Sequence, residues 1–242
     1  MTPQLTFKTT SARLFILLCG SLSLSLPCEA ARKARAIFIQ PPGGAPEKAV
    51  LFSSTRSEEI ELPARNLSPE IQLPAGDLSL AVLTHKPATG ETVNPNSPLV
   101  KIPEAWDRCI LLFFPDPENK VFPAKVIPVN ASQSDFRLGE TLIYNVTPAT
   151  VLARFAERVY RIEPGKSTVV APPIAGSGSY QVAIDCTLPG ETQPTAVCRS
   201  SWQHDPEARQ ILFVTPTPGR NIPRVWGILD HEAPDSVATG KN

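Results

Sequence analysis

Few residues of this chain have the types and spacing that catalysis or metal binding requires. The chain contains three histidines, and none of them lies in an HxH or HExxH spacing that would place two ligands on one face. The most suggestive group is His204 and Asp205 together with Asp230 and His231. Imidazole and carboxylate groups bind Zn²⁺ if loops of one domain bring them together. We state this group as a metal-site hypothesis, with polar surface residues as the simpler interpretation.

Three of the five cysteines, Cys109, Cys186 and Cys198, lie outside the N-terminal segment. Cys186 and Cys198 flank a stretch with Pro-Gly and Gln-Pro turn signals, so we expect them to face each other across a β-hairpin. In an oxidising compartment this arrangement predicts a disulfide, with a pair of reduced thiols as the alternative. Cys109 begins a very apolar run. Because burial raises the pKa of a thiol, we expect a core cysteine there and not a nucleophile.

Other catalytic and cofactor motifs are also incomplete. The stretch 165–167 (Gly-Lys-Ser) looks like the end of a phosphate loop, but Tyr160 stands where the first glycine of that motif belongs. We therefore nominate no catalytic and no cofactor-binding residue, and we expect the protein to have no catalytic activity of its own. The alternative is a secreted hydrolase or metal-dependent enzyme that uses loop residues of its second domain.

The N-terminal segment 1–30 has the features of an export signal. A weakly basic start precedes a short apolar run at 14–27, and Cys28 and Ala30 then supply small residues at the two positions that a signal peptidase reads. The run is too short for a bilayer core of about 30 Å, so we expect cleavage after Ala30 or Ala31 and no membrane span afterwards. Basic residues directly after this site oppose translocation, which leaves an uncleaved N-terminal anchor as the alternative. We expect a periplasmic or extracellular protein, of bacterial origin.

Composition excludes two classes of partner. The 23 Lys and Arg residues balance the 23 Asp and Glu residues, whereas nucleic acids and anionic membranes favour clustered basic residues. The remaining candidates are a protein or a polysaccharide of the cell envelope or exterior. The 27 prolines punctuate apolar runs, and proline is tolerated in turns and at strand edges but not inside helices.

Short segments rich in Val, Ile and Leu, bounded by Pro, Gly, Asn or Asp, predict an all-β protein. No stretch of a dozen residues sustains the apolar period of a helix. The predicted strands are 35–40, 58–62, 78–84, 109–114, 125–129, 141–146, 158–162, 180–187, 210–215 and 224–229.

The segment 109–127 is echoed by 210–226, which indicates an internal duplication. The alignment makes Gly76 equivalent to Gly165, Gly90 to Gly190 and Ile110 to Ile211, and it places an extra loop of the second copy at 172–178. Each copy has the size and strand content of an immunoglobulin-like β-sandwich. We therefore expect two tandem sandwiches after the signal peptide, with a flexible C-terminal tail. The predicted boundaries are 31–123, 124–231 and 232–242.

Overall fold

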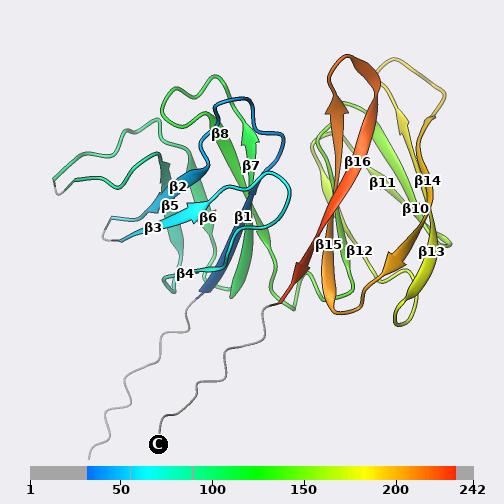
Figure 1. Ribbon diagram of the computed structural model, residues 1–242, viewed down its shortest axis with the longest axis horizontal. Coiled ribbons are helices and arrows are strands. Elements are labelled where there is room, and N and C mark those ends of the chain that lie inside the picture. Colours follow the sequence, from blue (N-terminus) through cyan, green and yellow to red (C-terminus); the bar gives the residue numbers. More distant parts are fainter. Residues whose placement is uncertain (1–31, 55, 89, 233–242) are drawn as a thin grey trace, which may run out of the picture.

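The computed structural model describes residues 32–54, 56–88 and 90–232 (Figure 1). The expected signal segment 1–30 and residues 233–242 of the expected tail lie outside these ranges. Within them the chain is all-β, with sixteen strands in four four-stranded sheets. The predicted fold class is therefore confirmed at the level of an all-β protein with sandwich-like layers.

The first half forms sheet A, with strand order β4-β1-β7-β8, and sheet B, with order β3-β2-β5-β6. Its strands are β1 (Arg32–Phe38), β2 (Lys48–Phe52), β3 (Ser57–Glu61), β4 (Ile71–Leu73), β5 (Leu78–Leu83), β6 (Leu99–Ile102), β7 (Arg108–Pro115) and β8 (Ala124–Asn130). Strands β1 and β7 are parallel, and the other neighbours in these two sheets are antiparallel.

The second half forms sheet C, with order β12-β9-β15-β16, and sheet D, with order β11-β10-β13-β14. Its strands are β9 (Thr141–Asn145), β10 (Thr150–Phe155), β11 (Arg158–Ile162), β12 (Ser167–Val170), β13 (Gly178–Thr187), β14 (Thr195–His204), β15 (Ala208–Thr217) and β16 (Arg220–His231). Strands β9 and β15 are parallel, as β1 and β7 are in the first half.

The two halves thus share one strand order, because adding eight to each strand number of sheets A and B gives sheets C and D. Ile110 of β7 and Ile211 of β15 occupy corresponding strands. Gly76 lies between β4 and β5 but Gly165 lies between β11 and β12, so the predicted equivalence of these two glycines is wrong. Both have positive φ, 82° and 68°, and many tight turns require glycine for that reason.

Strand β8 pairs with β7 along its whole length, from Ala124 to Asn130. The sequence boundary at 123 placed this segment at the start of the second domain. By strand pairing it completes sheet A of the first half.

The four sheets stack in the order B, A, C, D, with a hydrophobic core in each of the three gaps. Alternate residues of β7 serve different cores. Leu111 and Phe113 pack between sheets A and B, whereas Ile110, Leu112 and Phe114 pack between sheets A and C. Both faces of sheets A and C are therefore covered, which explains why β7 is a continuous apolar run. We call the gap between sheets A and C the junction.

Candidate binding site

His204, the last residue of β14, is nearly buried and bound to backbone on both sides. Its Nδ1 lies 2.6 Å from the carbonyl oxygen of Gly176, and its Nε2 lies 2.9 Å from that of Gly139. Gly139 has a φ of 80°, and a Cβ there would lie 3.3 Å from Nε2. The imidazole therefore joins two loops of the second half, and neither nitrogen is free to bind a metal.

Asp230, near the end of β16, is fully buried at the junction. Its Oδ1 accepts a hydrogen bond from Arg35 Nη1 at 2.7 Å, and Arg108 Nη2 lies 3.9 Å from the same oxygen. Its Oδ2 lies 3.4 Å from Arg209 Nη1. Since Arg35 and Arg108 belong to the first half, this carboxylate links the two halves electrostatically.

Two further carboxylates, Glu232 in the second half and Glu70 in the first, belong to the same network of charges. Arg209 donates from Nη2 to Glu232 at 2.6 Å, and Arg108 Nη2 lies 3.0 Å from Glu70. Burial raises the pKa of Glu232. The hydrogen bond and charge of Arg209, together with the charge of Arg108, lower that pKa by more, so the net shift is downward. The arginines and carboxylates of this network are thus paired with one another at the junction.

The other two nominated residues are also apart from any shared site. Asp205 accepts a hydrogen bond from the backbone nitrogen of Glu207 at 2.9 Å, in the turn after β14, and His231 is exposed. The described ranges hold no group of three or more His, Cys, Asp or Glu side chains that could bind a metal ion. The structure therefore does not bring the four nominated residues into one site. His204 joins two loops, Asp205 lies in a turn, Asp230 is buried at the junction, and His231 is exposed.

The predicted hairpin of β13 and β14 is present, but the predicted disulfide between Cys186 and Cys198 is wrong. Both are free thiols in the structure, as is Cys109. A bulge shifts the ladder after Ile184, so Cys198 lies opposite Ile184 while Cys186 lies opposite Thr195. The register of the hairpin thus holds the two cysteines at least two positions out of alignment on either side of the bulge.

Thiol labelling should distinguish the three cysteines. Burial raises the pKa of Cys109 to about 12, and both Cys109 and Cys186 are fully buried, whereas Cys198 is half-buried. Of these three cysteines, we expect N-ethylmaleimide at neutral pH to label Cys198 alone in the folded protein, and all three after unfolding. Mass spectrometry of the digested protein measures this. Labelling of native Cys109, or loss of two free thiols without reductant, would contradict the structure.

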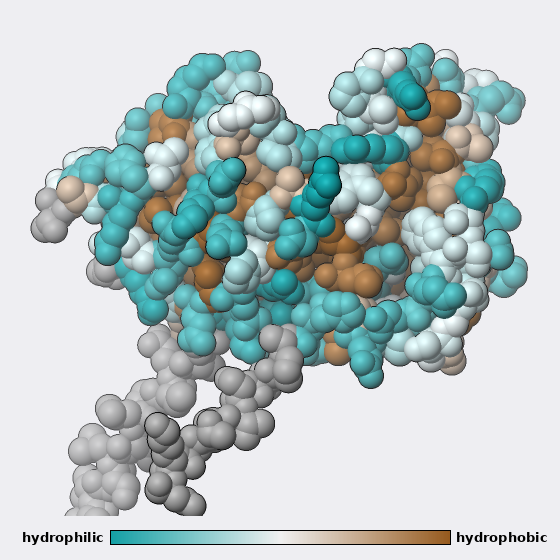
Figure 2. Space-filling view, in the orientation of Figure 1, coloured by the Kyte–Doolittle hydropathy of each residue, from teal (hydrophilic) through white to brown (hydrophobic). Residues whose placement is uncertain are grey.

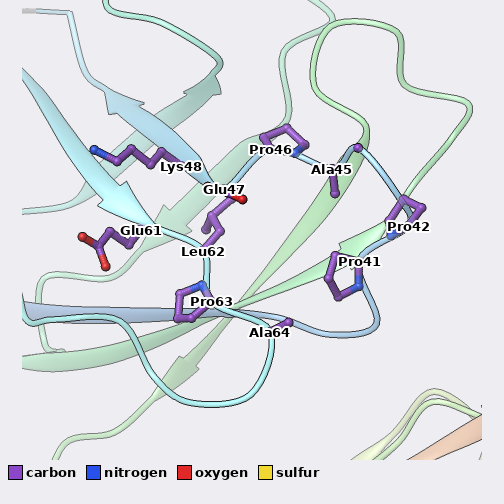
Figure 3. A pocket seen from close by; sticks show the side chains of 11 residues that line it. Pro41, Pro42, Ala45, Pro46, Glu47, Lys48, Glu61, Leu62, Pro63 and Ala64 are labelled. Atoms are coloured by element: carbon purple, nitrogen blue, oxygen red, sulfur yellow. The ribbon is translucent and has the colours of Figure 1, made fainter.

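An open cavity of about 600 Å³ lies in the first half, where the β1–β2 and β3–β4 loops meet (Figure 3). Prolines line much of it, and Lys48 and Glu61 extend away from them. The Lys48 ammonium is already paired with Glu59 at 2.7 Å. With few unpaired polar groups, this cavity is the weaker candidate for a specific ligand.

A cavity of about 580 Å³ opens in the second half between β14 and β16. Trp202 and Leu212 contribute apolar lining, and Leu229 is 48% exposed beside them. Gly227 has no side chain, and this leaves space beside β16 that a larger residue would fill. An added Cβ there would lie 2.5 Å from a methyl carbon of Leu212. Polar groups of the same cavity come from Ser201, Gln203, Asp205 and Gln210.

A neighbouring cavity of about 860 Å³ shares Val225 with the first and extends to the β15–β16 hairpin. Ile222 is 47% exposed there. Figure 2 shows hydrophobic surface along this side of the second half, between the positions of β16 and β14 in Figure 1. We call the two cavities together the β14/β16 groove. Its lining residues are 197, 201–203, 205, 210, 212, 217 and 219–229.

The first half shows how the corresponding side looks when it is closed. Strand β6 corresponds to β14, and its inward residues Val100 and Ile102 are each 1% exposed. Val100 lies opposite Leu80 of β5, whereas Ser200 lies opposite Val182 of β13. Ser200 is exposed. Within the corresponding strands, the first half thus has a buried aliphatic side chain at Val100 and the second half an exposed hydroxyl at Ser200.

The segments at the start of β8 and β16, which occupy corresponding places in sheets A and C, show the same contrast. Phe122, two residues before β8, is fully buried in the core between sheets A and B. Ile222 of β16 also precedes a proline, yet it is 47% exposed. The second half therefore leaves apolar surface uncovered where the first half covers it with its own side chains.

From the sequence we predicted a strand at 224–229 but nominated neither this segment nor Trp202 as part of a binding site. Trp202 does pack edge-on against Phe155, with ring centroids 6.0 Å apart, but it also lines the groove. The signal that could have found the groove is Ser200, a polar residue opposite the buried Val182, and it becomes clear only once the pairing of β13 with β14 is known. No protein-family model matches the chain, and no curated protein proves similar to it, so the groove is interpreted from its own chemistry.

Proposed function

We propose that this protein is an exported, non-catalytic binding module of the cell envelope or exterior, which holds its ligand in the β14/β16 groove. The observation that carries the proposal is the contrast between the halves, one closed by its own side chains and the other open. An exposed apolar groove with a polar rim is typical of a binding site. We further propose that both halves are immunoglobulin-like sandwiches derived by duplication, which their common strand order supports.

The start of β1 supports the export proposal. Cleavage after Ala30 or Ala31 would leave intact this strand, which begins at Arg32. The Arg32 guanidinium is buried and donates to the carbonyl oxygens of Gly76 at 2.8 Å and Glu104 at 3.2 Å. Arg32, one of the basic residues that oppose translocation, thus has a structural role in the folded protein. Within the described ranges, no helix has the length and apolar character that crossing a bilayer demands.

A binding role is favoured over a hydrolase or metal-dependent enzyme. General acid–base chemistry needs a titratable group within reach of a substrate proton. His204 is held between two carbonyl groups, and Asp230 is enclosed by arginines. Neither lies free in the groove.

The groove is tested by replacing Leu229 with aspartate. We expect Leu229→Asp to abolish ligand binding, because it places a charge on the apolar lining that the ligand must cover. Parallel screens of a random-peptide phage library and a glycan array supply the ligands. Leu99→Asp is the matched control, since Leu99 is 59% exposed on the first half, outside the groove. If every ligand found in either screen binds Leu229→Asp as tightly as it binds the wild-type protein, the groove is not the binding site.

A further inference from the structure

We infer that the groove takes an extended peptide with aliphatic side chains at alternate positions and acidic residues at one end. This inference rests on the proposed function and adds the class of ligand. Four features support it, namely the edges of the groove, its lining, the spacing of side chains on β6 of the first half, and the charges along the groove.

The edges of the groove are formed by two unpaired strand edges. β14 is the outer strand of sheet D and β16 is the outer strand of sheet C, so each pairs with one neighbour within the described residues. The outer edge of such a strand presents backbone N–H and C=O groups that an extended peptide can pair with. A sugar chain has no matching ladder of donors and acceptors.

The lining of the groove suits aliphatic side chains better than sugar rings. Val197, Leu212, Val225 and Leu229 contribute to it. Sugar rings stack on exposed aromatic faces, but the two tryptophans that line the groove, Trp202 and Trp226, are only half-exposed, and each packs against a core phenylalanine.

The first half shows how an extended strand covers such a lining. On β6, Val100 and Ile102 are spaced two residues apart and pack into the core between sheets A and B. Side chains at this spacing share one face of an extended chain. Strand β14 holds the place of β6 in the second half, so a bound peptide would lie beyond the edges of β14 and β16 and turn its alternate aliphatic side chains toward the exposed lining.

The charges along the groove indicate a polarity for the peptide. Arg220 and Arg224 are exposed at the hairpin end, and neither forms an ion pair within the described part of the chain. Asp205 lies at the opposite end. Complementary charge across an interface fixes orientation and speeds association. Acidic residues of the peptide are therefore placed beside the two arginines.

The experiment selects random dodecapeptides on phage against the wild-type protein, with counter-selection on Leu229→Asp. We expect the enriched peptides to share alternate Val, Ile or Leu residues and an acidic end. For a selected peptide, fluorescence polarisation should show affinity at least about tenfold weaker for Leu229→Asp and for Ile222→Asp, since each removes a covered aliphatic side chain. Leu99→Asp should bind as wild type does.

The arginines are tested with the same peptide. Arg220→Glu and Arg224→Glu should each weaken binding several-fold at low salt, and exchange of the acidic end of the peptide for lysines should reverse the preference. Groove-dependent binding of glycans without groove-dependent peptides would overturn the peptide inference and leave the proposed function standing. Absence of groove-dependent binding in both screens would overturn both. Enrichment of basic peptides would overturn the inferred polarity.

Discussion

Replacing Asp230 with alanine is expected to lower the free energy of unfolding by about 3–5 kcal/mol, the usual cost of removing one partner from a buried ion pair. The substitution leaves Arg35, Arg108 and Arg209 close to one another without the carboxylate that lies between them. Arg209 is fully buried, so water cannot replace the lost charge. Urea or guanidinium unfolding followed by circular dichroism measures the change.

Two further variants identify the cause of this loss. Asp230→Asn keeps the shape of the side chain and removes its charge, so a loss close to that of Asp230→Ala assigns the effect to electrostatics. Glu157→Ala removes an exposed carboxylate in the β10–β11 turn and should change stability by less than about 0.5 kcal/mol. If Asp230→Ala costs no more than Glu157→Ala, the network at the junction does not stabilise the fold.

Phe213→Ala is expected to cost about 3–5 kcal/mol as well, by opening a cavity in the junction. Phe213 of β15 is fully buried and packs against Trp226, with ring centroids 4.8 Å apart. The core that it fills contains side chains of both halves, including Ile110 and Leu112 of β7. We therefore expect wild type and variant to unfold in one cooperative transition, because neither half retains its buried surface when the other is lost.

Differential scanning calorimetry tests this cooperativity. A single peak should move to lower temperature in Phe213→Ala, while Val159→Ala, at a position 56% exposed, should leave it nearly unchanged. Two separate peaks, of which only one moves, would show that the halves are independent domains connected by a weak interface.

The sequence predicted the strands with the strongest apolar patterns but not how their sheets stack. The run in β7 indicates burial on both faces, yet burial alone does not say which surface covers each face. Strands with weak patterns were missed. β14 contains Arg199, Ser200 and Ser201, and it forms because β13 pairs with it, not because its own composition favours a strand.

The charge network was equally hidden from sequence reasoning. Asp230 and Arg35 are far apart in the chain and come together only because β16 and β1 meet at the junction. Asp230 was grouped with His231 as a candidate metal ligand because the two polar residues are adjacent in the sequence. Adjacent polar residues in such a position are usually both exposed. Alternation in β16 decides otherwise, because it directs Asp230 inward and leaves His231 outside.

The same alternation connects the junction to the proposed ligand. Trp226, Ile228 and Asp230 of β16 face the junction, while Gly227 and Leu229 face the groove, which Trp226 and Ile228 also border. The same strand therefore contributes to both the junction and the groove. Because the junction fixes β16 through a hydrophobic core and buried ion pairs, its groove face is held in place before a ligand arrives. Such preorganisation reduces the entropy lost on binding.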